Sequence, residues 1–290
     1  MEYRTLGKTG LKVSRIGFGG APIGICNYLS PEDRDSEEFR SHTVAAIREA
    51  VARGITYFDT APAYGDGRSE RLMGEALEGH RTQVALATKF AFHEGTCRED
   101  YTAGLRLSLE RLRTDHVDIL QLHGGFFDDK LGSRIIASGV LDWAEEMRRE
   151  GLCRFRGITA EGPSGALERL LRTGRFDVLM IAYNLILQSP CNYLNHPTGI
   201  IPFARDLGIG VTTMRPTTCG FLQKLLGSAF PGLDTAKLTR LAIQFVLSTP
   251  EVDCVVVGMR TAEEVAANVA LADDDAGRLD LRALHTRTVG

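Results

Sequence analysis

The sequence predicts a closed (β/α)8 barrel, formed as one domain by residues 1–290. Two observations carry this prediction. Short apolar, β-branched segments alternate with segments of helical periodicity along the chain, at a mean spacing of about 30 residues. Eight such strand–helix units, with no low-complexity linker between them, favour a closed barrel. An open, doubly wound sheet is the alternative, because periodicity alone does not show closure.

The elements follow one another in a regular order. Residues 3–14 place a Lys-Thr-Gly turn between two short β-prone segments, which predicts a small hairpin. The first barrel strand is expected at 14–20. The other strands are expected at 55–59, 84–88, 117–122, 155–158, 177–182, 209–214 and 252–257. The helices are expected at 37–53, 69–78, 99–113, 134–150, 163–172, 198–206, 235–247 and 261–271.

The first strand ends in a glycine-rich segment that resembles part of a dinucleotide-binding fingerprint. Gly17, Gly19 and Gly20 are present, but the third glycine of the fingerprint is missing. Pro22 stands where the helix of that fingerprint should already be under way. The segment therefore argues against a Rossmann fold.

Composition and charge exclude several classes of protein. The net charge of −3 gives no basic footprint for nucleic acid or for anionic membranes. No apolar run reaches 18 residues, and the N-terminus lacks the apolar core of a signal peptide. The six cysteines are widely separated, which is typical of small buried side chains in a reducing compartment. We expect a cytoplasmic protein with a small-molecule partner; the sequence carries no indication of an oligomeric state.

Four ionisable side chains stand at or just past the carboxyl ends of three successive predicted strands. Asp59 ends one strand, and Tyr64 lies in the loop that follows. Lys89 and His123 come directly after the next two strands. Because the carboxyl ends of barrel strands form one face, where active sites lie, we expect these groups to converge on one site.

These residue types suit the reduction of a carbonyl group. Free tyrosine has a pKa near 10, and we expect the ammonium of Lys89 to lower the pKa of Tyr64. Asp59 can supply the counter-charge that a partly buried lysine needs. His123 can donate a hydrogen bond to an oxygen held beside the Tyr64 hydroxyl. Each residue alone has an ordinary interpretation as a cap, a packing group or a solvated charge. Their conjunction at consistent barrel positions favours catalysis.

Four segments resemble the aldo-keto reductases: LGKTGLKVSRIGFGG at 6–20, FDTAPAYGDGRSERLMGEAL at 58–77, ATK at 87–89 and LQLH at 120–123. The resemblance covers essentially the whole chain. It implies a (β/α)8 barrel that binds NADP(H) in extended form without a Rossmann motif. It also implies a catalytic tetrad of Asp59, Tyr64, Lys89 and His123, in which Tyr64 is the general acid. Hydride then passes from nicotinamide C4 to the carbonyl carbon of an aldehyde, ketone or sugar.

The resemblance implies nicotinamide contacts that this sequence matches only in part. The Ser-Asn pair usual after the fifth strand is Thr159-Ala160 here, and the usual glutamine of the sixth strand is Met180. Where the family often stacks an aromatic ring on the nicotinamide, this chain has Met214. Arg215 is expected to meet the pyrophosphate.

The adenosine end of the implied cofactor site matches better. We expect contacts from Gly20, Gly258, Arg260, Thr261, Glu264 and Asn268. Arg260 can clamp a 2′-phosphate, and Thr261 adds a hydroxyl at a helix N-terminus. Glu264 stands where a carboxylate would repel that phosphate. NADP(H) is favoured, and NAD(H) is the alternative.

Three loops are expected to shape the substrate pocket. Residues 23–33, with Tyr28, and 124–132, with Phe126 and Phe127, are expected to wall it. The phenylalanines suggest an apolar wall, and plain packing is the alternative. Residues 217–233 are expected to fold over the cofactor, while Trp143 fits the helix period and is expected in the core.

Two other functions stay open on the sequence. One is an NAD(P)+-dependent dehydrogenase that oxidises an aldose or another alcohol, because similar barrels run in both directions. The other is a cofactor-binding regulatory subunit with little turnover, which the departures around the nicotinamide suggest.

Overall fold

The barrel is closed and entirely parallel, as predicted. The computed structural model describes residues 1–26, 34–192 and 198–285. Its strands are hydrogen-bonded in the order β10-β3-β4-β5-β6-β7-β8-β9, and β9 pairs with β10 to close the ring. This closure rules out the open sheet. The strands are β3 (Ile16–Gly19), β4 (Tyr57–Asp59), β5 (Ala85–Phe90), β6 (Val117–Leu122), β7 (Cys153–Ala160), β8 (Val178–Ala182), β9 (Gly210–Met214) and β10 (Cys254–Gly258).

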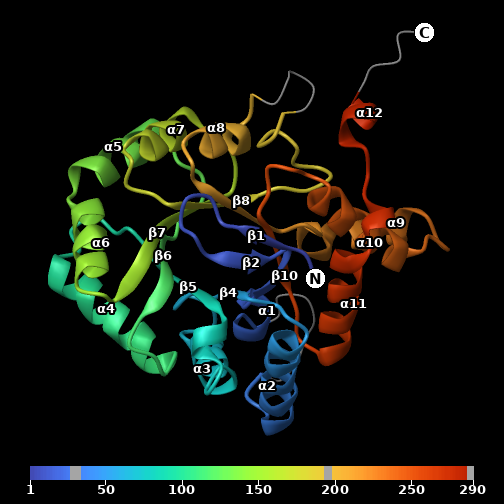
Figure 1. Ribbon diagram of the computed structural model, residues 1–290, viewed down its shortest axis with the longest axis horizontal. Helices are drawn as coiled ribbons and strands as arrows, with labels where there is room; N and C mark the ends of the chain where they lie inside the picture. Colours follow the sequence, from blue (N-terminus) through green and yellow to red (C-terminus); the bar gives the residue numbers. More distant parts are fainter. Residues whose placement is uncertain (27–33, 193–197, 286–290) are drawn as a thin grey trace.

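Helices form an outer ring around the strands (Figure 1). Eight of the described helices follow the barrel strands in turn: α2 (Glu37–Ala52), α3 (Arg68–Ala76), α4 (Arg98–Arg111), α6 (Val140–Arg149), α7 (Gly165–Arg172), α8 (Ile200–Asp206), α10 (Thr235–Leu247) and α11 (Ala262–Asp273). Ser36, Ser164 and Asp234 begin three of them as N-caps, each accepting a hydrogen bond from a backbone N–H of the first turn.

The structure adds short helices that the sequence did not predict: α1 (Ala21–Gly24), α5 (Asp129–Ala137), α9 (Phe221–Ala229), α12 (Leu281–His285), η1 (Arg81–Gln83), η3 (Thr218–Gly220) and η4 (Asp275–Gly277). The single helix expected at 134–150 is wrong. Gly139 adopts a left-handed φ of 78° and separates α5 from α6. Pro22 also does not prevent a helix, because it lies in the first turn of α1, where the missing N–H costs nothing.

Apolar side chains form two layers, one inside the barrel and one between the strands and the helices. The inner layer includes Tyr57, Ile119 and Cys254, and Leu6 of the N-terminal hairpin joins it. That hairpin pairs β1 (Tyr3–Thr5) with β2 (Lys12–Ser14) and lies across the centre of the ring in Figure 1. The outer layer contains Trp143, as predicted, with its ring centroid 4.9 Å from that of Phe90.

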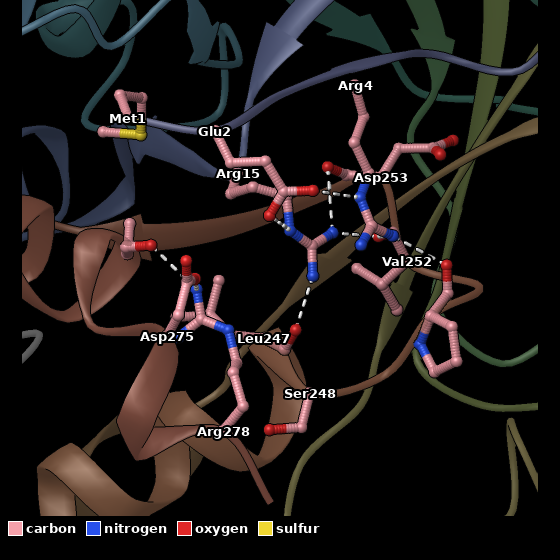
Figure 2. Close-up of polar contacts among 12 residues, drawn as sticks. Met1, Glu2, Arg4, Arg15, Leu247, Ser248, Val252, Asp253, Asp275 and Arg278 are labelled. Atoms are coloured by element: carbon pink, nitrogen blue, oxygen red, sulfur yellow. Dashed lines mark hydrogen bonds and ion pairs between the residues drawn. The ribbon is translucent and has the colours of Figure 1, made fainter.

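A buried arginine ties the N-terminal segment and the link between α10 and β10 to the barrel (Figure 2). The guanidinium of Arg15 donates to the carbonyl oxygens of Leu247 (2.5 Å), Val252 and Asp253 (3.3 Å). Its Nε lies 3.6 Å from the carboxylate of Glu2. Burial lowers the pKa of Arg15 to about 10, so the group keeps its charge at neutral pH. Arg15 therefore fixes the end of α10 and the start of β10 against the first barrel strand.

The cysteines match the sequence interpretation only in part. Cys153, Cys191 and Cys254 are buried, whereas Cys26 and Cys97 are exposed. Across the three described ranges, no helix combines the length and apolar character that a membrane crossing requires.

Candidate active site

A pocket at the carboxyl ends of the strands contains all four residues of the predicted tetrad. Asp59, Tyr64, Lys89 and His123 line it together. They come from β4 and its loop, from β5 and from the end of β6, which are neighbours in the barrel. The convergence expected from the sequence is therefore what the fold produces.

Asp59 and Lys89 form a buried ion pair at the base of the pocket. Lys89 Nζ lies 2.6 Å from Asp59 Oδ2, and the two side chains are 1% and 4% exposed. The same ammonium donates to the backbone carbonyl of Thr60 at 2.7 Å. The other carboxylate oxygen, Oδ1, accepts a hydrogen bond from Gln121 Nε2 at 2.8 Å. Each charged atom therefore has a partner in a place where water is excluded.

The loop that carries Tyr64 is held by close backbone approaches. The Tyr64 N–H donates to the carbonyl of Ala61 at 3.0 Å. Gly65 adopts a φ of 68°, and a Cβ there would lie 2.1 Å from the carbonyl oxygen of Gly24. A Cβ on Gly24 would in turn lie 2.3 Å from the carbonyl oxygen of Tyr64. Glycine is required at both positions, so this contact between α1 and the loop sets the place of Tyr64.

Tyr64 lies between the ammonium and the imidazole. Lys89 Nζ is 4.7 Å from the centroid of the phenol ring. The His123 ring meets the Tyr64 ring edge-on, at 84° and 5.9 Å between centroids. The backbone N–H of His123 donates to the carbonyl of Phe90 at 2.7 Å and fixes the end of β6 against β5. A substrate oxygen in this pocket can therefore meet both the phenol and the imidazole.

Burial changes the pKa values of these groups. It raises the pKa of Tyr64 above the usual 10, and the nearby ammonium of Lys89 opposes this effect without outweighing it. Lys89 lowers the pKa of Tyr64, as expected. The expected net decrease is nevertheless wrong, because burial raises this pKa by more than Lys89 lowers it. Burial lowers the pKa of Lys89, but the Asp59 carboxylate and the Tyr64 phenol together outweigh burial, so the pKa of Lys89 is raised above its usual value. Burial and the charge of Lys89 lower the pKa of His123 to about 4.

Several residues expected around the nicotinamide line the same pocket. Thr159, Met180 and Met214 line its floor. The Thr159 hydroxyl accepts from the backbone N–H of Gly124 at 2.9 Å, so it is engaged by the loop after β6. The floor is mostly apolar, which suits the flat face of a nicotinamide ring.

Arg215 lines the pocket in an unusual backbone conformation and has a protein partner. Its φ of 58° lies in the left-handed region, and its carbonyl accepts from Asn184 Nδ2 at 3.0 Å. Its guanidinium lies 2.6 Å from the carboxylate of Glu161, another lining residue. A pyrophosphate at this place would have to share Arg215 with Glu161.

Of the residues expected at the adenosine end, Gly258 lines this pocket, whereas Gly20, Arg260, Thr261, Glu264 and Asn268 do not. Thr261 is the N-cap of α11 and accepts from the Glu264 N–H at 3.2 Å. Arg260 Nη2 lies 3.0 Å from the Glu264 carboxylate. Asn268 is half-buried on α11, and Gly20 packs against α3.

The loops expected to wall the pocket contribute Ile25 and Gly124 to its lining, but neither Phe126 nor Phe127 lines it, so the apolar wall of phenylalanines is wrong. Phe127 is 4% exposed and packs in the outer layer. Its ring occupies space that a side chain at position 124 would fill, since a Cβ on Gly124 would lie 2.1 Å from Phe127 Cζ. Phe126 is 76% exposed and does not line the pocket. Tyr28 and residues 27–33 lie outside the described residues. The segment 217–233 contains η3 and α9, and Thr217 and Cys219 from it line the pocket.

The sequence argument missed Gln121 and Glu161. Gln121 is fully buried in β6 and contacts Asp59, and its signal was a polar residue near the carboxyl end of a buried strand. Glu161 follows β7, and its pairing with Arg215 joins segments 54 residues apart, which no local pattern reveals.

A comparison with protein families identifies the barrel. The model of the family described as "Aldo/keto reductase family" matches residues 15–230. The chain belongs to this family. Membership confirms the resemblance seen in the sequence and the prediction of an NAD(P)H-dependent oxidoreductase.

Relatives of this aldo/keto reductase cover nearly its whole length. The L-galactose dehydrogenase of Arabidopsis thaliana is 34% identical over an alignment 300 residues long, which covers 93% of this chain and 88% of that protein. The holo form of the aldo-keto reductase AKR11C1 from Bacillus halodurans superposes with a TM-score of 0.74 at 26% identity, covering 98% and 95% of the two chains. An aldo/keto reductase from Klebsiella pneumoniae, in complex with NADP and acetate, shares the fold at a TM-score of 0.73 and 22% identity, over 94% and 90%.

We expect His123 of this aldo/keto reductase to titrate near pH 4, instead of near its ordinary pKa of 6.5. The unfolded chain would bind this proton first as the pH falls from 6.5 to about 4, so acidification over that range favours unfolding. A proton NMR titration of the imidazole C2–H measures the pKa, with His123→Asn to assign the signal. Titration at the ordinary value would contradict the burial of an uncharged ring.

Proposed function

We propose that this protein reduces the carbonyl group of an aldehyde, ketone or sugar with NADP(H), with Tyr64 as general acid. One observation carries the proposal. The phenol of Tyr64 shares a pocket with the Lys89 ammonium and the His123 imidazole, and the ammonium is held by a buried carboxylate. The arrangement supports proton delivery to an oxygen.

The pocket fits a nicotinamide cofactor. Thioether and aliphatic side chains line part of it, and Gly258 packs against Pro22 at its edge, where a Cβ on Gly258 would lie 2.4 Å from Pro22 Cγ. A bound nicotinamide would supply the hydride that reduces the carbonyl carbon. Met180, Met214 and Val256 would pack on its ring, and Thr159 would lie beside its amide.

The protein's own residues would hold the substrate and provide the proton. The carbonyl oxygen would lie between the Tyr64 hydroxyl and the His123 ring. His123 is uncharged at neutral pH, because its pKa is about 4, so it donates one N–H and contributes no charge. Tyr64 gives its proton to the oxygen as negative charge develops there. Lys89 stabilises the phenolate that this leaves.

Two carboxylates compete with the proposed cofactor for its arginines. Glu161 holds Arg215, where the pyrophosphate is expected, and Glu264 holds Arg260, where the 2′-phosphate is expected. Glu264 also accepts from the backbone N–H of Arg260 at 2.7 Å. We propose that NADP(H) binds by sharing or replacing these partners; NAD(H), which has no 2′-phosphate, is the alternative.

A second candidate function is the oxidation of an aldose or another alcohol with NAD(P)+. The 34% identity to the L-galactose dehydrogenase of Arabidopsis thaliana favours it. The same site serves both directions, because the Tyr64 phenolate can take back the proton it gave. A regulatory role with little turnover fits the complete tetrad less well. A cytoplasmic location and a small-molecule substrate complete the proposal.

We expect Tyr64→Phe to lower kcat for carbonyl reduction by about a hundredfold or more, because it removes the proton donor. The ring and its contact with Lys89 stay in place, so cofactor binding should be retained. Absorbance of the nicotinamide, with a panel of aldehydes and sugars and either reduced or oxidised cofactor, measures the rate and the direction.

Tyr101→Phe is the matched control, since the Tyr101 hydroxyl bonds the backbone of His93 and does not line the pocket. It should keep wild-type turnover. Tyr64→Phe activity within threefold of wild type would remove Tyr64 from the role of acid.

We expect Arg260→Ala to raise the Kd for NADPH by about tenfold and to leave the Kd for NADH unchanged, because only NADPH carries the 2′-phosphate. Glu264→Gln should change the NADPH affinity in the opposite direction. Nicotinamide fluorescence measures both constants. Arg149→Ala, at a 68% exposed side chain, is the control. Equal NADPH affinity in wild type and Arg260→Ala would disprove the clamp.

A further inference from the structure

We propose that Gln121 is a positioning residue of the site: its amide fixes the ionised carboxylate of Asp59 and, through it, the ammonium of Lys89. The inference rests on the proposed reductase function and assigns a role to a residue outside the tetrad. Gln121 does not itself line the pocket; it contacts the lining residue Asp59 from behind. It would act on the reaction only through Asp59.

The contact is direct and shielded from water. Gln121 is fully buried in β6, and its Nε2 lies 2.8 Å from Asp59 Oδ1. The other carboxylate oxygen, Oδ2, accepts from Lys89 Nζ at 2.6 Å. Each oxygen of Asp59 therefore has its own donor, one neutral and one charged. A carboxylate held by two donors on different strands cannot rotate without breaking a charge-assisted bond.

The orientation of the amide is set by Asp59. An ionised carboxylate only accepts hydrogen bonds, so Gln121 must present its NH2 group to it. The remaining amide oxygen, Oε1, is then buried without a hydrogen-bond partner among the described residues. An apolar side chain of the same length would avoid that cost. The bond to Asp59 is thus what a glutamine provides at this position.

The barrel also leaves space for this side chain. Gly157 is the neighbour of Gln121 across the β6–β7 pairing. A Cβ on Gly157 would lie 2.7 Å from Gln121 Cγ, closer than side chains approach. The missing side chain of β7 therefore lets the glutamine lie inside the barrel, where it reaches Asp59.

Holding Asp59 also directs Lys89. The ammonium has three N–H groups; one donates to Asp59, and a second donates to the Thr60 carbonyl. The third is left to face the phenol of Tyr64, whose ring centroid is 4.7 Å away. If the Asp59 carboxylate rotated, the Lys89 ammonium bonded to it would move as well. Two hydrogen bonds and one contact between the ammonium and the phenol ring therefore connect Gln121 to Tyr64.

Few other groups can account for a pH effect at Asp59. The titratable neighbours that act on or feel its charge are Tyr57 and Tyr64 from β4 and its loop, Lys89 from β5 and Cys254 from β10. Burial raises the pKa values of Tyr57 and Cys254 far above neutrality, so both are uncharged. Lys89 is the cation that depends on Asp59.

Two substitutions separate positioning from packing. Gln121→Met keeps the length of the side chain and removes the donor. It should lower kcat by about tenfold at every pH, with KM for the substrate little changed. Gln121→Glu keeps the shape and can donate only while the introduced carboxyl is protonated. Beside Asp59 that carboxyl should have a raised pKa, because two neighbouring carboxylates resist ionising together.

The pH profile of kcat is the deciding measurement. Gln121→Glu should reach within about threefold of wild type near pH 5.5 and fall about tenfold or more by pH 8, as the new carboxyl loses its proton. Ile119→Val, a buried change two residues earlier on β6, is the control for packing and should keep the wild-type profile. Circular dichroism establishes that each variant is folded.

Wild-type kcat in Gln121→Met, or a loss in Gln121→Glu that is the same at both pH values, would overturn the inference. A wild-type enzyme that reduces no carbonyl, or an active Tyr64→Phe variant, would instead overturn the proposed function. The two failures are therefore distinguishable in one set of measurements.

Discussion

The ion pair between Asp59 and Lys89 is the interaction on which the site depends. Both side chains are nearly inaccessible to water, so each charge would be costly without the other. The pair keeps a lysine charged at the base of an otherwise largely apolar pocket, in contact with the phenol of Tyr64. Removing either partner would leave an uncompensated buried charge. The geometry of the neighbouring groups follows from keeping this pair intact.

Closure of the barrel makes the pair possible. Parallel pairing of β4, β5 and β6 brings Asp59, Lys89 and His123 to one face, although they are dispersed along the sequence. Two glycine contacts then place Tyr64 over the ammonium, since neither Gly24 nor Gly65 could carry a side chain. The N-terminal hairpin and Arg15 close the opposite end of the barrel. The candidate catalytic residues and the contacts that close the barrel thus lie at opposite ends of the strands.

The sequence allowed the fold and the convergence of the tetrad to be predicted, because both depend on local patterns. Alternating strands and helices imply a parallel sheet, and residues at strand ends share one face. The features that the sequence could not reveal depend on burial and on contacts between residues far apart in the chain. The net rise in the pKa of Tyr64 comes from burial, and Glu161 meets Arg215 across the barrel mouth. Phe127 packs inward because Gly124 leaves room for it.

The central claim is that the ammonium of Lys89 makes Tyr64 a better proton donor than a buried phenol would otherwise be. The pH dependence of carbonyl reduction in wild type and Lys89→Met tests it most directly. Without the ammonium the pKa of Tyr64 should rise further, so the rate should fall and the alkaline limb of the profile should move to higher pH. A slower enzyme with an unchanged alkaline limb would contradict the claim.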